Sequence, residues 1–177
     1  MSRSQSINLN LTNGSVNGLT KASLLNWTGN VLVAPRNKIA ELVAQDECSE
    51  TGIYFLFGQN GITPHIYIGT STNLAEKLQE EDQSKDSNGG HHWDKVFVVT
   101  SRESNIGKAH LNYLRISLLN LAYESKNCLL TNHPTTNGKQ PPPNLSESDK
   151  ADMDFFLNQM KVALSVLGLE FLADQPI

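Results

Sequence analysis

Two cations on one helical segment are the side chains of this sequence best placed to hold an anion. From about residue 105 to residue 126 the apolar positions recur at helical spacing and fill one broad arc. Arg115 falls inside that arc, and Lys108, seven residues earlier, points the same way. A charge on an apolar face is costly unless it opens into a cleft or meets a partner. The pattern therefore indicates either an anion-holding arginine or one paired with a buried carboxylate or a backbone carbonyl.

The remaining side of this helix is predicted to be polar. It carries His110, Tyr113, Ser117, Asn120 and Glu124. We expect the histidine to be solvated or hydrogen-bonded. The residues that share the direction of Arg115 include no acid, so the helix itself offers no carboxylate for a metal ion there. Asp94, Glu103 or an incoming segment could still supply one through the tertiary fold.

Two tyrosines stand at matched places on adjacent predicted strands. The tripeptides Gly52-Ile53-Tyr54 and Tyr67-Ile68-Gly69 flank a turn marked by glycine and proline, and the segments around them predict a hairpin. Strand propensity alone can explain two tyrosines in such places. Whether the two tyrosines only pack in the sheet or take part in a functional site has to be judged from the elements around them.

Turn residues and periodicity outline these elements. Residues 7–11 alternate apolar and polar as a half-buried strand does, and residues 30–35 predict a second short strand. Residues 36–47 have apolar positions at helical spacing, which predicts a short amphipathic helix. Residues 95–101 form a continuous β-branched run, which is typical of a buried central strand.

Two more helices are predicted. Capping residues after Gly69 open an exposed helix that carries Lys77. A C-terminal helix begins with Ser146 and Asp149 in the arrangement of a capping box. Its apolar stripe, which we expect to pack into the core, consists of Met153, Phe156, Leu157, Met160 and Leu164.

The aromatic side chain of Trp93 is predicted to anchor a loop. Adjacent histidines point apart and lack the spacing of metal ligands, so His91 and His92 beside it are expected to be solvated.

The order of strand, hairpin, helix, strand and long helix resembles that of the GIY-YIG nuclease superfamily. The resemblance rests on the two tripeptides, on "LNWTGNVLVAPR" upstream and on "KAHLNYLRISLLNLA" with the following proline linker, and it spans roughly residues 7–172. These segments look like a bacterial branch of the family. The resemblance implies an α+β fold with a small, mainly antiparallel three-stranded sheet flanked by helices, an N-terminal strand and helix extension, and a C-terminal helix.

The resemblance also implies a division of the chain. Residues 1–48 would form the extension packed on the core, residues 49–133 the nuclease-like core, residues 134–145 a semi-rigid proline-rich linker, and residues 146–177 the C-terminal helix packed on the core.

The family assigns roles to the paired tyrosines. One orients or deprotonates the attacking water and the other contacts the phosphate, while an arginine steadies the phosphate and a glutamate on the long helix holds a divalent metal ion. Tyr54 and Tyr67 match the two tyrosines, and Gly69 matches the glycine that ends the second strand. If the chain cleaves, the resemblance implies that Tyr54, Tyr67 and Lys77 are catalytic, with Mg²⁺ or Mn²⁺ as cofactor.

The charged positions depart from the family pattern. Lys77 stands at the arginine, which keeps the charge but loses the planar fork, and Glu81 stands at a histidine. Arg115 stands at the metal-binding glutamate, and a guanidinium has no lone pair for a cation and repels one. We therefore expect a degenerate active site without a metal ion, in which Lys77, Lys108 and Arg115 turn the cleft toward phosphate or another anion.

Three functions stay open on the sequence. The first is a degenerate nuclease-like protein that binds DNA phosphate or another anion. The second is an active, metal-dependent DNA endonuclease with a non-standard metal ligand, and the third is a regulatory protein-interaction module. The residues expected to contact the anion are Tyr54, Tyr67, Gly69, Lys77, Lys108 and Arg115.

Composition sets the outer bounds. A chain of 177 residues with 38% apolar content can bury one sizeable core. Its polar N-terminus and the lack of a long apolar run predict a cytoplasmic protein without a membrane partner. The net charge of −4 gives no general attraction for nucleic acid, so any such binding needs a local patch. Cys48 and Cys128 lie far apart in sequence and are expected to be reduced core residues.

Overall fold

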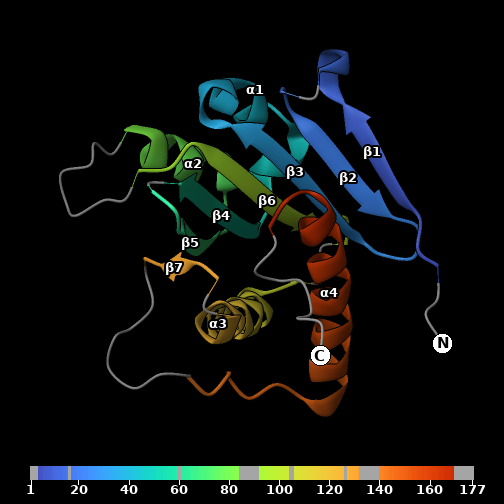
Figure 1. Cartoon of the computed structure of the whole chain (residues 1–177). Coiled ribbons are helices and arrows are strands. Elements are labelled where there is room, and N and C mark those ends of the chain that lie inside the picture. Colours follow the sequence, from blue (N-terminus) through green and yellow to red (C-terminus); the bar gives the residue numbers. More distant parts are fainter. Residues whose placement is uncertain are drawn as a thin grey trace.

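In the part of the chain that the structure describes, seven strands form a mixed sheet with helices on both faces (Figure 1). The computed structural model describes residues 4–15, 17–59, 61–83, 92–103, 106–125, 127–131 and 140–169. In these ranges the strands are β1 (Ile7–Leu11), β2 (Thr20–Leu24), β3 (Gly29–Pro35), β4 (Gly52–Gln59), β5 (Pro64–Ser71), β6 (Lys95–Ser101) and β7 (Leu129–Leu130). The α-helices are α1 (Ile39–Val43), α2 (Leu74–Gln83), α3 (Lys108–Ser125) and α4 (Glu147–Val166).

The prediction of a three-stranded sheet is wrong in its extent. The strand order is β1-β2-β3-β6-β4-β5-β7, and every pairing is antiparallel except that of β5 with β7. The expected trio β4, β5 and β6 is therefore embedded in a larger sheet. The N-terminal strands join it because β3 pairs along the whole of β6, from Gly29 opposite Ser101 to Pro35 opposite Lys95.

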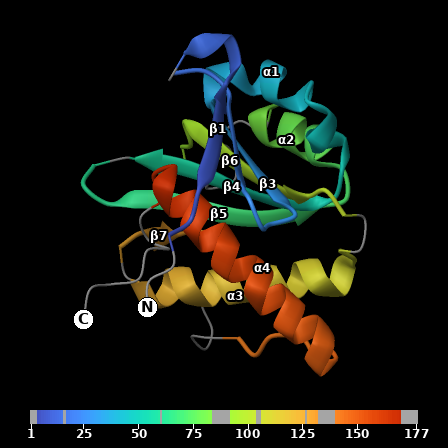
Figure 2. The same cartoon turned by 90° about the vertical axis from the view of Figure 1, so that its right-hand side faces the viewer.

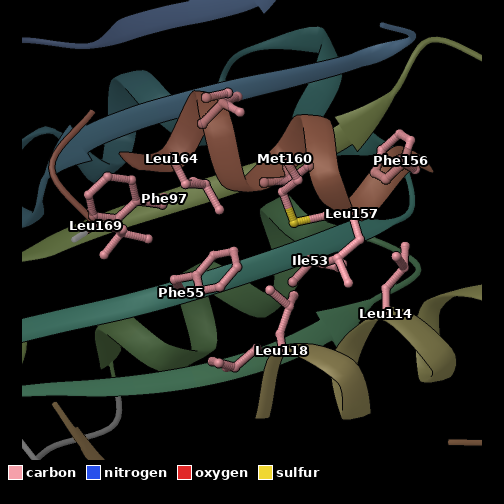
Figure 3. Packing of buried hydrophobic residues seen from close by; sticks show 14 of the residues in the cluster. Ile53, Phe55, Phe97, Leu114, Leu118, Phe156, Leu157, Met160, Leu164 and Leu169 are labelled. Atoms are coloured by element: carbon pink, nitrogen blue, oxygen red, sulfur yellow. The ribbon is translucent and has the colours of Figure 1, made fainter. Parts of the chain in front are cut away.

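Alternation along the central strands builds two cores. Ile53 and Phe55 of β4 face one side with Phe97 of β6, and they pack against α3 and α4. Tyr54 and Leu56 face the other side, where α1 and α2 lie. Figure 2 shows the two helix layers on opposite faces of the sheet, and Figure 3 shows side chains of α3 and α4 meeting those of the strands. Both faces of β4 are buried, so the strand reads as a nearly continuous apolar run.

The helices follow the sequence with one exception. All members of the predicted stripe of α4 are buried, and the Oγ of Ser146 accepts a hydrogen bond from the Asp149 N–H over 3.1 Å, so the predicted cap is confirmed. The helix predicted over 36–47 is instead broken into a 3₁₀ turn, the short α1 and a second 3₁₀ turn. Within α1 only Leu42 is fully buried, so little apolar contact sustains a longer helix.

Cys48 and Cys128 are both free and buried, as predicted. Among the described residues, no helix is both long and apolar enough to cross a lipid bilayer.

Candidate functional site

The paired tyrosines lie side by side beneath α2. Their ring centroids are 6.0 Å apart and the ring planes differ by 26°. Tyr54 is 1% exposed and Tyr67 is partly buried. Residues two apart on a strand share a face, and β4 and β5 pair in a register that brings the two side chains to the same face. The predicted hairpin is confirmed, and its register places the two tyrosines on one face of the sheet.

Gly69 makes room for the ring of Tyr54. The two residues are directly opposite in the antiparallel register. A Cβ added at Gly69 would lie 2.5 Å from Cζ and from Oη of Tyr54, which no real contact allows. The close approach of the Tyr54 ring therefore explains why a glycine is needed at position 69 without any ligand. The predicted contact of Gly69 with phosphate stays a prediction.

A carboxylate from α2 closes over the hydroxyl of Tyr54. The Tyr54 Oη donates a hydrogen bond to Oε1 of Glu81 over 3.0 Å. Glu81 was not among the predicted site residues. The signal was present, because Leu74, Leu78 and Glu81 stand at spacings of four and three and so share the sheet-facing side of α2.

The predicted phosphate-binding lysine is already paired. The Nζ of Lys77 lies 3.4 Å from a carboxylate oxygen of Glu80 and 3.6 Å from one of Glu81. Partial burial lowers the pKa of Lys77, but the two glutamates outweigh it and the pKa is raised. With two acids on one lysine, this end of α2 is electrostatically unfavourable for a phosphate.

The hydroxyl of Tyr54 is held in its neutral form. Burial raises the pKa of Tyr54 well above its usual range, and the neighbouring Tyr67 and Glu81 raise it further. A phenolate here would be desolvated and would face a carboxylate. In this arrangement Tyr54 can donate a hydrogen bond to Glu81 but is a poor proton acceptor for an attacking water.

The two cations of α3 are carried by the other helix layer. α3 packs on the face of the sheet opposite α2, and β5, which carries Tyr67, contacts both helices. Arg115 is half-buried, with Leu111 and Leu118 of the same side fully buried, and Lys108 is exposed at the first turn. Arg115 forms no hydrogen bond or ion pair with any residue in the described ranges. The alternative of an arginine neutralised by a buried carboxylate therefore finds no partner in this part of the chain.

The two acids that the fold could have supplied as metal ligands flank β6. Tyr54 pairs with Val98 in the middle of β6, whereas Asp94 precedes that strand and Glu103 follows it. Glu81, by contrast, touches Tyr54. Within the described ranges, no group of three or more His, Cys, Asp and Glu side chains is arranged to hold a metal ion.

The prediction that Tyr113 lies on a polar face of α3 is wrong. Its side chain is 5% exposed, and its hydroxyl donates to Oδ1 of Asp154 on α4 over 2.6 Å. Burial and this bond raise the pKa of Tyr113 to about 12. His110 fits its prediction, because its Nδ1 accepts from the Gly107 N–H over 3.0 Å. Helix α4 packs against the side of α3 that carries Tyr113, which the sequence predicted to be polar.

Trp93 anchors its loop, as predicted. The guanidinium of Arg36 lies 4.2 Å from the centre of the Trp93 ring and donates to the Trp93 carbonyl over 3.2 Å. The same guanidinium donates to the side chain and to the carbonyl of Asp82 at the end of α2, over 3.0 and 3.1 Å. This clamp fixes the C-terminal end of α2, and with it the helix that carries Glu81. His92 is exposed, and His91 lies outside the described residues.

Comparison of this chain with protein families, with curated proteins and with solved structures finds no match.

Proposed function

We propose that this chain is a GIY-YIG nuclease-like protein that has lost phosphodiester cleavage and holds a phosphate of nucleic acid, or a comparable anion, through Arg115 and Lys108 of α3. The proposal rests on the resemblance of the two tripeptides and their neighbouring segments to that family. The stacked pair Tyr54 and Tyr67 is consistent with it.

The observation that carries the proposal is the contrast between the two cationic positions. Lys77 forms ion pairs with Glu80 and Glu81, and these two carboxylates would repel an anionic ligand. Arg115 is half-buried and unpaired with any described residue. A guanidinium offers five donors in a planar fork that matches two phosphate oxygens, and a partly desolvated site strengthens that interaction. Anion binding is therefore favoured at α3 over α2.

Loss of cleavage is supported by the state of Tyr54. A tyrosine that orients or activates water needs a hydroxyl that is accessible and able to accept a proton. The hydroxyl of Tyr54 is buried and donates to Glu81. In the family pattern Arg115 stands at the metal-binding glutamate, so a fixed positive charge takes the place of that carboxylate.

A cleavage assay tests the first half of the proposal. Supercoiled plasmid is incubated with the protein and Mg²⁺ or Mn²⁺, and we expect no nicking above that of the Tyr54→Phe variant. Metal-dependent nicking that Tyr54→Phe abolishes would instead establish the active endonuclease, with Glu81 as the first carboxylate to examine as its metal ligand.

A binding assay tests the second half. Fluorescence anisotropy with labelled single-stranded and duplex DNA should give an affinity that falls steeply as salt rises. Arg115→Gln should weaken binding about tenfold, which corresponds to roughly 1.4 kcal/mol, and should make the salt dependence shallower.

Lys150→Gln is the matched control, because it removes the same charge from an exposed position of α4. Equal effects of the two variants would reduce the role of Arg115 to net charge. Binding that does not depend on salt, or no binding at low salt, would favour the protein-interaction module instead.

A further inference from the structure

Among the described strands, one edge of the sheet has no further strand beside it. β1 is the first strand in the sheet order and pairs with β2 alone among the described strands. The opposite edge is β7, which has only two residues, and a very short edge strand is a common protection against pairing with another chain. β1 has no such protection, because its five residues INLNL include neither a charge nor a proline.

The backbone groups that point outward from β1 can be assigned. The Thr12 N–H donates to the Leu19 carbonyl over 2.9 Å, and Thr12 continues the antiparallel register in which Leu11 faces Thr20. Because N–H and C=O groups alternate sides along a strand, the residues of even number bond to β2. The N–H and C=O groups of Ile7, Leu9 and Leu11 therefore face away from the sheet.

The side chains of β1 divide in the same regular way. Leu9 lies opposite Ala22, a member of the core under α3 and α4, so it projects on that face. It is nevertheless 51% exposed. Asn8 and Asn10 lie opposite Ser23 and Lys21, on the other face, and both are exposed. Figure 2 shows that β1 and α4 lie on the same side of the molecule.

We infer that the open edge of β1 pairs with β1 of a second copy of this chain, antiparallel and centred on Leu9. The sequence of the strand is symmetric in character about Leu9, with an asparagine on each side and a branched apolar residue at each end. In the centred register Leu9 faces Leu9 of the second copy, Asn8 faces Asn10, and Ile7 faces Leu11. In this register the outward N–H and C=O groups of Ile7, Leu9 and Leu11 in one copy meet those of Leu11, Leu9 and Ile7 in the other, so they can form hydrogen bonds across the axis.

This register satisfies both the backbone and the side chains. Leu9 residues pair with each other on the α4 face, where each is now exposed, and opposed asparagines can exchange amide hydrogen bonds on the other face. Antiparallel pairing of identical edges creates a twofold axis perpendicular to the sheet, so the sheet continues through both copies with the two α4 helices on one face. A second copy fits this edge better than an unrelated strand, because no charge on β1 selects a partner of another kind.

Disulfide trapping tests the register. In a centred antiparallel pair the two Cα atoms at position 9 lie about 5.5 Å apart, which is within disulfide range. Leu9→Cys should therefore form a covalent dimer under mild oxidation. Leu25→Cys is the control, because Leu25 is 76% exposed but lies beyond the end of β2, off the edge. The native thiols do not compete, since both are buried and burial raises the pKa of Cys48 to about 12 and of Cys128 to about 11.

Sedimentation and light scattering test the association itself. The unmodified chain should show a monomer–dimer equilibrium that shifts toward dimer as concentration rises. Leu9→Lys places two like charges across the axis and should leave only monomer, with its helix and strand content unchanged by circular dichroism. A monomer at every concentration, or covalent dimer from Leu9→Cys no faster than from Leu25→Cys, would overturn the inference.

Discussion

Replacing Gly69 by alanine puts a methyl group where the ring of Tyr54 lies. The added Cβ would come within 2.5 Å of the ring and hydroxyl of Tyr54, so one of the two groups has to move. The Gly69 backbone is held in the ladder of β4 and β5, and Tyr54 is buried beneath α2. The ring must therefore shift away from its place, and its bond to Glu81 is strained or lost.

The cost follows from these two effects. Overpacking a tight core costs about 1–3 kcal/mol, and a lost hydrogen bond to a charged group costs about 1.5–3 kcal/mol. We expect Gly69→Ala to lower the free energy of unfolding by about 3 kcal/mol, which in a chain of this size lowers the Tm by roughly 9 °C. Urea denaturation followed by circular dichroism measures the change.

A double-mutant cycle with Tyr54→Leu isolates the clash. Leucine lacks the Cζ, Cε1 and Oη atoms that the new methyl group would meet. In the Tyr54→Leu background, Gly69→Ala should cost less than about 0.5 kcal/mol or be stabilising, because alanine restricts the unfolded chain. Gly18→Ala is the control for the glycine substitution itself, since its added Cβ meets only ordinary contacts near 3.6 Å.

Two outcomes would refute this reasoning. One is a loss below about 0.5 kcal/mol for Gly69→Ala in the unmodified chain, well under the usual cost of overpacking. The other is an equal loss in both backgrounds, which would mean that Tyr54 is not the group displaced. In either case Gly69 would need another explanation, and its predicted role at a ligand would gain weight.

Three further variants test the packing around the site. Unfolded tyrosine loses its proton near pH 10.0 while folded Tyr113 keeps it to about 12, so stability should fall as pH rises through this window, and Tyr113→Phe should flatten that fall in denaturation midpoints. Ser146→Ala removes the cap of α4 and should cost about 1 kcal/mol in thermal melts, whereas Ser148→Ala should cost almost nothing. Arg36→Lys should destabilise by about 1–2 kcal/mol in urea, because lysine cannot bond Asp82 and Trp93 together.

Much of the site could be predicted from local sequence. The turn residues and the two short apolar runs predicted the hairpin that carries Tyr54 and Tyr67, and the spacing of residues on α2 would also have pointed Glu81 at the sheet. The cap at Ser146 and the buried stripe of α4 followed from helical periodicity. The bond between Tyr54 and Glu81 could not be predicted from either segment alone, because it joins residues 27 positions apart.

Other features depended on the tertiary structure. The sequence of β2 offers only Ala22 and Leu24 to a core, and its strand exists because β1 and β3 pair on either side. Tyr113 is buried because α4, which begins only at Glu147, crosses α3 and brings Asp154 to its hydroxyl.

The sequence by itself determined the apolar stripe of α4, where that helix begins, and the hairpin that carries the two tyrosines. Only the tertiary structure decided how many strands join the sheet, that the two tyrosines share a face, that Lys77 is ion-paired while Arg115 is not paired in the described ranges, and that β1 is left at an edge of the described sheet. The reason is physical. Periodicity within a segment records the contrast between core and solvent, but the partner that covers each face is chosen by contacts between segments far apart in the chain.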